Sequence, residues 1–228
     1  DCLRAAIRLP PVAPRAGVEN NRFAKGVVWG DYDNDRFPDL YVSNMDGMNR
    51  LYRNNADGTF TSVEEEAGLG TLPNSTDADW VSFDGEVLPS LSVTAWDGSN
   101  FLNRNLQDGT FADVAGDLGV RDPGRTVTAA WGDFLNEGRP AAFFGRDRMI
   151  NLLNVPIVSG AGSVGGYVET ATPLGMALSE ETTTMTAAWL DYNGDGLLDL
   201  AAGTYAGSLY LFENRTGPIR LCPYQEDL

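Results

Sequence analysis

Residues 29–40, WGDYDNDRFPDL, space four carboxylates along one short loop. They stand at positions one, three, five and nine of the loop and are Asp31, Asp33, Asp35 and Asp39. The main-chain carbonyl of Phe37 falls at position seven. Oxygen ligands at this stepping can converge on one hard cation, and Ca²⁺ takes about 6 to 8 oxygens from carboxylates, carbonyls and water. The stretch therefore predicts a Ca²⁺-binding loop.

Four tryptophans divide the chain into four similar copies. They are Trp29, Trp80, Trp131 and Trp189, spaced by 51, 51 and 58 residues. Each ends an apolar or small run and is followed by a polar loop, a second apolar run and an alternating segment. In the first two copies Asp57-Gly58 and Asp108-Gly109 come next, and Asp-Gly between alternating runs favours a hairpin because type I′ turns need positive φ. Each copy thus predicts four short antiparallel strands, which is typical of a β-propeller blade.

The whole chain, residues 1–228, is predicted to be one all-β domain, a propeller of four four-stranded blades. The copies fall near residues 19–70, 71–121, 122–178 and 179–216. Gly17 precedes Trp29 by the same twelve residues that separate Gly68 from Trp80, so residues 2–18 resemble a fourth strand without its first three. Because the last copy lacks a clear fourth strand, we expect residues 2–18 to complete that blade and close the ring. The alternative is an open fragment of a larger ring.

A second loop, in the fourth copy, repeats the acidic spacing. DYNGDGLLD supplies Asp191, Asn193, Asp195 and Asp199, with the carbonyl of Leu197 at position seven. Copy three has Leu135 and Ala141 at ligand positions, and copy two keeps too little charge, so we expect two Ca²⁺ sites. The alternative for such loops is a set of ordinary Asx turns. Position six needs a positive φ, which costs a bulky residue roughly 1 kcal/mol; copy four has Gly196 there and copy one has Arg36, so the copy-four loop is predicted to bind more tightly.

The composition limits the classes of partner and the cellular compartments that fit this protein. The formal net charge of −16 argues against nucleic acid and against an anionic membrane as partners. The sequence contains no run of 18 apolar residues, so it predicts no transmembrane helix. Cys2 and Cys222 are either two free thiols or a disulfide that ties the ends together. A disulfide requires an oxidising environment, which predicts a secreted, extracellular protein or one in another oxidising lumen.

The first copy, GVVWGDYDNDRFPDLYVSNMDGMNRLYRNNADGTFTSVEEEAGL, resembles FG-GAP (VCBS-type) repeats of the kind found in integrin α-subunit propellers. WLDYNGDGLLDLAAG in the fourth copy follows the same pattern. The resemblance implies that the Asp and Asn residues of the two acidic loops bind Ca²⁺ on one face of a propeller and brace its blades. Family propellers commonly have seven blades, from which a four-copy chain departs. The family's functions include adhesion, glycan binding and some enzymes, so membership does not settle function.

Three functions are therefore open. The first is a non-catalytic protein-interaction or adhesion scaffold, alone or as a subunit of a larger assembly, whose partner binds opposite the Ca²⁺ loops through residues 44–49, 97–100 and 204–208. The second is a lectin, for which the candidate residues are Tyr52, Asn54, Asn103 and Asn105. The third is a carboxylate-pair glycosidase, although the clustered acids are already explained as Ca²⁺ ligands. The sequence contains no histidine, which excludes Ser-His-Asp, Cys-His and His-ligated zinc chemistry, and we predict that the protein is not an enzyme.

Overall fold

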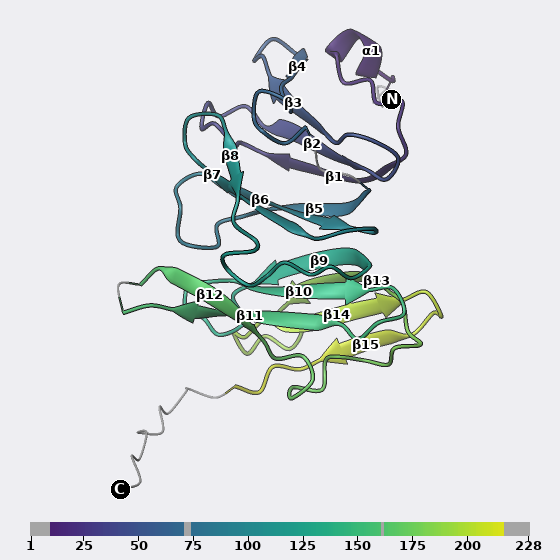
Figure 1. The fold of residues 1–228 in the computed structure, drawn as a ribbon, viewed down its shortest axis with the longest axis vertical. Coiled ribbons are helices and arrows are strands. Elements are labelled where there is room, and N and C mark those ends of the chain that lie inside the picture. The colour runs from purple at the N-terminus through teal and green to yellow at the C-terminus, as the bar shows by residue number, and fades with distance from the viewer. Residues whose placement is uncertain (1–9, 71–73, 161, 217–228) are drawn as a thin grey trace, which may run out of the picture.

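Four antiparallel sheets follow one another along the chain in the computed structural model, which describes residues 10–70, 74–160 and 162–216 (Figure 1). Blade 1 consists of β1 (Ala24–Gly30), β2 (Asp39–Asn44), β3 (Arg50–Asn54) and β4 (Phe60–Ser62). Blade 2 consists of β5 (Ser75–Val81), β6 (Ser90–Ala95), β7 (Phe101–Asn105) and β8 (Phe111–Asp113). Blade 3 consists of β9 (Thr126–Gly132), β10 (Ala141–Arg146), β11 (Leu152–Val158) and β12 (Val164–Glu169). Blade 4 has three strands in the described residues: β13 (Thr184–Leu190), β14 (Asp199–Thr204) and β15 (Leu209–Phe212).

The predicted hairpins are present in the first two blades. Gly58 and Gly109 both have φ of 87°, a conformation that glycine adopts without strain. Asp57 Oδ1 accepts a 2.9 Å hydrogen bond from Thr59 N–H, and Asp108 does the same for Thr110 at 3.0 Å. These turns connect the third and fourth strands and confirm the prediction of a hairpin at each Asp-Gly.

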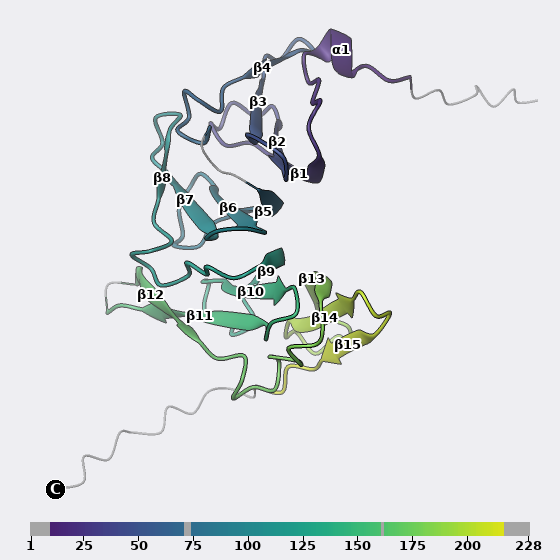
Figure 2. The same ribbon diagram turned by 45° about the vertical axis from the view of Figure 1, so that its right-hand side comes forward.

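The blades are stacked side by side in chain order. The first strand of each blade lies beside that of the next, in the order β1, β5, β9, β13. Figures 1 and 2 show blade 1 at one end of this array and blade 4 at the other, with blades 2 and 3 between them. Three apolar clusters fill the spaces between neighbouring blades. The fold is thus all-β and propeller-like, and its core lies between the blades.

Tryptophan packing explains why adjacent blades fit closely. Trp80 lies on Gly30 of blade 1, where an added Cβ would come within 2.4 Å of the Trp80 ring, and Trp189 covers Gly132 of blade 3 in the same way at 2.5 Å. The Trp189 ring is also stacked on Phe134, with ring centroids 5.3 Å apart. Trp29, which has no blade before it among the described residues, is 57% exposed.

The predicted closure of the ring by residues 2–18 is not seen in the described residues. Residues 13–16 form a short helix, α1 (Ala13–Ala16), rather than a strand, and this region contacts blade 1: the Tyr52 hydroxyl donates to Glu19 O at 3.0 Å. Figures 1 and 2 place α1 at the opposite end of the array from β15. Residues 2–9, including Cys2, lie outside the described residues, as does Cys222.

The physical reason is that residues 12–18 form the same turn that follows a fourth strand. Ala16 N–H donates to Val12 O at 2.9 Å, as Ala67 N–H donates to Val63 O at 2.9 Å. In both places the glycine that ends the turn contacts the fourth strand of the next blade: Gly17 lies on Phe60, and Gly68 lies on Phe111. The turn therefore belongs with the blade that follows it in the chain, which for residues 12–18 is blade 1.

Among the described residues, no helix is long and apolar enough to cross a membrane.

Candidate metal centres

The first acidic loop connects β1 to β2, and its ninth position is fixed by hydrogen bonds. Asp39 begins β2, is fully buried and pairs with Gly30 across the sheet. Its Oδ2 accepts a 3.2 Å hydrogen bond from Tyr32 N–H, and its Oδ1 accepts a 2.8 Å bond from Asn54 N–H. The carboxylate is therefore held between the start of the loop and the end of the third strand.

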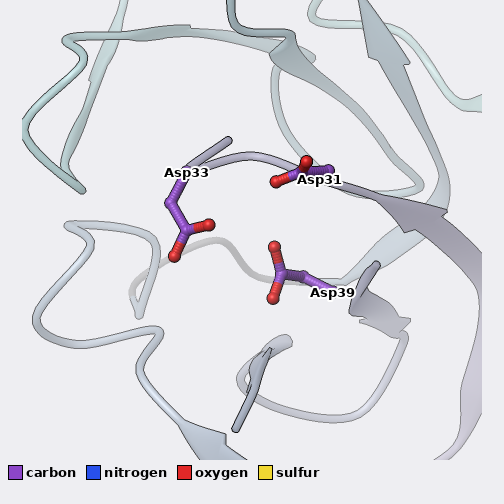
Figure 3. Close-up of side chains that lie close together, drawn as sticks. All are labelled: Asp31, Asp33 and Asp39. Atoms are coloured by element: carbon purple, nitrogen blue, oxygen red, sulfur yellow. The ribbon is translucent and has the colours of Figure 1, made fainter. Parts of the chain in front are cut away.

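Asp31 folds the loop back on itself. Its two carboxylate oxygens accept hydrogen bonds from Asp35 N–H at 3.1 Å and from Arg36 N–H at 3.0 Å. Arg36 has φ of 74°, the left-handed conformation expected at position six. As a result, Asp31, Asp33 and Asp39 each place one carboxylate oxygen within 4.8 Å of the others. Figure 3 shows these three side chains gathered around one space. The fourth predicted ligand, Asp35, stands outside this group of three.

Positions five and seven are linked to each other. Asp35 is exposed, and its Oδ1 accepts a 2.8 Å hydrogen bond from the N–H of Phe37. Phe37 is 43% exposed at position seven. The loop therefore keeps positions five and seven at its solvent side, while positions one, three and nine converge.

Burial raises the pKa of two carboxyl groups in this loop. Burial raises the pKa of Asp39 to about 6, against the opposing hydrogen bonds from Asn54 and Tyr32. Burial also raises the pKa of Asp33, and the charges of Asp35 and Asp31 add to it. Buried carboxylates close to one another favour either a proton or a cation. The donor set is made of hard oxygen ligands and so fits Ca²⁺.

The second acidic loop, between β13 and β14, repeats this hydrogen-bond pattern. Asp199 is fully buried and accepts from Tyr192 N–H at 3.2 Å and from Asn214 N–H at 2.7 Å. Asp191 accepts from Asp195 N–H at 3.2 Å and from Gly196 N–H at 2.9 Å. The two loops thus share one backbone conformation, because the bonds of Asp31 and Asp39 recur here at the equivalent positions.

The two loops differ in how their side chains converge. Asn193 at position three donates its amide N–H to Asp195 Oδ2 at 3.0 Å, and Leu197 N–H donates to Asp195 Oδ1 at 2.9 Å. Asp191 is exposed, and the Gly196 N–H is the main cause that lowers the pKa of its carboxyl. In the described part of the chain, the group of three converging acids occurs only in the first loop.

Copies two and three close the same loop without a full ligand set. In copy three Asp133 accepts from Glu137 N–H at 2.9 Å and from Gly138 N–H at 2.7 Å. In copy two Ser90 takes the place of Asp39, and its hydroxyl accepts a 3.2 Å bond from Asn105 N–H. The bonds at position one therefore recur in copy three and the bond at position nine recurs in copy two, whereas neither copy has the full acidic ligand set.

Asparagines at the ends of third strands join each acidic loop to a neighbouring blade. Asn105 Nδ2 in blade 2 donates to Tyr32 O in the first acidic loop at 2.8 Å. In blade 4, Asn214 Nδ2 donates to Phe134 O of blade 3 at 2.7 Å. The sequence signal for this role is an asparagine in all four copies: Asn54, Asn105, Asn154 and Asn214.

The residues considered for a sugar site do not form an open one. Tyr52 and Asn103 are each 3% exposed and Asn105 is 5% exposed, and Asn54 Nδ2 donates to Pro38 O at 3.0 Å. These side chains are packed or hydrogen-bonded within the blades.

The loops between second and third strands lie at the other end of the blades. Because β1, β2 and β3 are antiparallel, the β1–β2 loop and the β2–β3 loop leave the sheet at opposite ends. Residues 44–49, 97–100 and 204–208 therefore occupy the face opposite the acidic loops. Within them Asn49 and Asn100 are buried, and each donates to the next blade: Asn49 to Ser75 Oγ at 2.7 Å and Asn100 to Thr126 Oγ1 at 3.0 Å.

One position on that face recurs in every blade. It directly follows the second strand, and its N–H donates to a carbonyl before the first strand of the same blade. The residues at this position are Met45, Trp96, Asp147 and Tyr205. Arg125 lies over the Trp96 ring at 5.9 Å and is 3.6 Å from Asp147, and Tyr205 is 82% exposed. The face thus presents a thioether, two aromatic rings and a cation.

Comparison with known families agrees with this architecture. Residues 31–89 match the FG-GAP-like repeat, and residues 184–219 match the FG-GAP repeat. The two matched stretches contain the two acidic loops. The chain therefore carries FG-GAP repeats on a propeller-like array of blades, as the resemblance predicted.

Among curated proteins the chain is similar to Cartilage acidic protein 1. It is 26% identical to the Xenopus tropicalis protein over 230 residues, covering 94% of this chain and 34% of the relative. It is 29% identical to the Homo sapiens protein over 211 residues, covering 88% of this chain and 31% of the relative. The chain thus spans about a third of the length of these relatives.

Among solved structures the chain resembles BBS1N, described in complex with ARL6DN and soaked with lead. The TM-score is 0.50 at 14% identity, and the match covers 88% of this chain and 56% of that one. At this identity the likeness concerns the fold alone.

Proposed function

We propose that the protein is a non-catalytic, Ca²⁺-stabilised interaction module that binds a protein partner outside the cell or in another oxidising lumen. The observation that carries the metal part is the convergence of Asp31, Asp33 and Asp39 within 4.8 Å. Three carboxylates that close repel one another, and a divalent cation would relieve that repulsion. The equivalent loop around Asp191 and Asp199 supports a second site.

The partner is proposed to bind on the face opposite the acidic loops. Met45, Trp96 and Tyr205 occupy the recurring position in blades 1, 2 and 4, Asp147 occupies it in blade 3, and Arg125 lies over the Trp96 ring. Aromatic residues, methionine and arginine are the residue types enriched in protein interfaces. A role for the acidic loops as braces leaves this opposite face free for recognition.

Calorimetry with Ca²⁺ alone tests the metal part. We expect two Ca²⁺ per chain, one after Asp33→Ala or Asn193→Ala, and none after both substitutions. Asp117→Ala removes an exposed carboxylate elsewhere and serves as the matched control, which should bind two. No heat above that of a Mg²⁺ titration, or a stoichiometry that the loop variants leave unchanged, would contradict the proposal.

Cross-linking mass spectrometry on material from the extracellular fraction of the source tests the partner part. We expect one protein to be cross-linked by the wild-type chain and lost with Tyr205→Ser, whereas Leu106→Ser, at a 48% exposed residue of the β7–β8 hairpin, retains it. Capture that is equal for both variants would place the partner elsewhere. A glycan array probed with the same chain tests the lectin alternative, and sugar binding that Tyr205→Ser abolishes would replace the protein partner by a glycan.

A further inference from the structure

The fourth position of the loop between the first two strands has a left-handed backbone in every blade. Its φ is 64° at Asn34, 73° at Gly85, 55° at Asn136 and 76° at Gly194. Glycine adopts this conformation without strain, and asparagine adopts it more readily than most other residues. The loop conformation therefore favours these two residue types at position four, and the fourth copy has glycine.

Position three of the same loop is a predicted ligand position. It is Asp33 in the first acidic loop and Asn193 in the second. The amide at position three and the glycine at position four make Asn193-Gly194, and this is the one place in the sequence where glycine follows asparagine. The backbone conformation of the loop and its ligand set thus place an Asn-Gly pair at a candidate metal centre.

An asparagine that is followed by glycine can modify itself in water. The main-chain nitrogen of the glycine gives its proton to a base and attacks the asparagine Cγ. A new C–N bond closes a cyclic succinimide, and the side-chain nitrogen takes up a proton and leaves as ammonia. Water then opens the ring at either carbonyl and yields aspartate or isoaspartate. Glycine favours ring closure because it has no Cβ to hinder the approach, and both Asn193 and Gly194 are exposed to water.

Three hydrogen bonds oppose this reaction while the loop is closed. The N–H of Gly194 donates to Asp191 Oδ1 at 2.7 Å, which keeps the proton on the attacking nitrogen. Asn193 Oδ1 accepts from Asp195 N–H at 3.0 Å, and Asn193 Nδ2 donates to Asp195 Oδ2 at 3.0 Å. Both ends of the bond that would form are therefore engaged, and the reaction requires the loop to open.

Opening of the loop should depend on a bound cation. Asp191 and Asp195 are exposed carboxylates in one short loop, and repulsion between them favours the open form when no cation is bound. Exposed loops also open locally at a low cost in free energy. We propose that Asn193 is a site of spontaneous deamidation and that Ca²⁺ in the second acidic loop protects it. The protection rests on the proposed Ca²⁺ binding, whereas the reactivity of the Asn-Gly pair does not.

The two products change the loop in opposite ways. Aspartate gives position three the carboxylate that the first acidic loop has there, and it turns the bond to Asp195 into a contact of two carboxylates that a cation would relieve. Isoaspartate adds one methylene to the main chain. The N–H groups of Asp195 and Gly196, which donate to Asp191 at 3.2 and 2.9 Å, then lose their register. Aged protein should therefore contain one form that binds Ca²⁺ at this loop and one form that does not.

Peptide mass spectrometry measures the reaction after incubation of the folded chain at mildly alkaline pH, with a chelator or with Ca²⁺. With the chelator, Asn193 should deamidate at least about tenfold faster than Asn136. Asn136 is the internal control because it is exposed in the equivalent loop of copy three, where Glu137 follows it. Saturating Ca²⁺ should slow the deamidation of Asn193 and leave that of Asn136 unchanged.

Gly194→Asn is the matched variant, because asparagine takes position four with positive φ at Asn34 and Asn136. This variant should keep the loop conformation and slow deamidation of Asn193 at least about tenfold. Asp191→Ala removes the acceptor of the Gly194 N–H and should speed the reaction in the presence of chelator. Calorimetry on aged wild-type protein should find fewer than two Ca²⁺ per chain, whereas fresh protein with Asn193→Asp should bind two.

The possible results separate the reactive site from its protection. The site is overturned if Asn193 deamidates no faster than Asn136, or if Gly194→Asn leaves its rate unchanged. The protection is overturned if Ca²⁺ binds at this loop by calorimetry and the rate stays the same. If Asn193 deamidates fastest but no Ca²⁺ binds, the deamidation site is supported, and it is the proposed Ca²⁺ function that fails.

Discussion

The side-chain amide of Asn105 in blade 2 donates a 2.8 Å hydrogen bond to the main-chain carbonyl of Tyr32 in blade 1. Tyr32 lies between Asp31 and Asp33, so this bond connects the order of the first acidic loop to the contact between two blades. The same amide also donates to Pro89 O at 3.2 Å. A candidate metal loop and a blade interface therefore share one side chain.

Asn105→Ala should lower stability and weaken Ca²⁺ binding at the first loop. Removing the amide leaves buried carbonyls without a donor, which costs about 1–3 kcal/mol. Chemical denaturation measures the first effect, and calorimetry measures the second. Asn55→Ala removes an exposed 3.0 Å bond to Thr59 within one hairpin and is the matched control. Equal Ca²⁺ affinity in the two variants would show that the loop is ordered without the neighbouring blade.

Arg36→Gly should raise both Ca²⁺ affinity at the first loop and stability. Arg36 has φ of 74°, and its equivalent in the other loop, Gly196, has φ of 85°; glycine removes a strain of about 1 kcal/mol. Arg36→Ala separates strain from charge, because it removes the cation and keeps the positive φ in a residue with a Cβ. The wild-type loop around Asp191 is expected to bind more tightly, and equal affinities in Asp33→Ala and Asn193→Ala, measured by calorimetry, would refute that order.

Gly30→Ala should destabilise the protein by about 1–3 kcal/mol. A Cβ at Gly30 would lie 2.4 Å from the Trp80 ring, so the two blades would have to separate or the ring would have to move. Gly165→Ala is the control, because its nearest neighbour, Ile157 O, would be 3.7 Å away. Thermal denaturation compares the two, and the prediction fails if their midpoints fall by the same amount.

Asp79→Asn should stabilise the protein at alkaline pH. Burial, with the charge of Asp77, raises the pKa of Asp79 from 3.8 to about 7, and its buried Oδ2 has no hydrogen-bond partner among the described residues. Because the folded state holds the proton more tightly than the unfolded state, the stability from this group is present below about pH 4 and is lost as the pH rises through 7.

The difference in unfolding free energy between Asp79→Asn and the wild type isolates this group from the acidic loops. It should grow from about zero at pH 4 to about 1–3 kcal/mol at pH 8. Asp117→Asn, at an exposed carboxylate, should show no such growth. A difference that is flat across this range would mean that Asp79 ionises normally in the folded protein.

Much of the architecture could be predicted from local patterns. The acidic spacing from Asp31 to Asp39 and the Asp-Gly turns are signals within one blade, and the structure places these elements as predicted. The repeats then predicted the number of sheets, because one tryptophan recurs at the same place in each of the four copies. The structure confirms four sheets. It brings Asp31, Asp33 and Asp39 together without Asp35, and the binding of Ca²⁺ stays a prediction.

The features that could not be predicted from the sequence depend on how neighbouring blades contact one another. Residues 12–18 carry the signal of a completed fourth strand, but sequence alone does not tell whether that turn contacts the blade before it or the blade after it. The role of Asn105 was equally invisible, because its partner Tyr32 is 73 residues away and an asparagine at a strand end also suits a turn cap. Trp29 is exposed because no described blade covers it, and the repeat pattern in the sequence does not predict which tryptophan is left uncovered.

The order in which the four described blades unfold should depend on their positions in the array. Among the described residues, blades 2 and 3 each contact two neighbouring blades, whereas blades 1 and 4 contact one each, and in such nearest-neighbour systems stability is shared between adjacent units. Amide hydrogens of β6 and β10 should therefore exchange with deuterium more slowly than those of β2 and β14. Those of β14 should exchange fastest, because its sheet has three strands in the described residues. The position of each blade, rather than its sequence, would then determine the order of local unfolding.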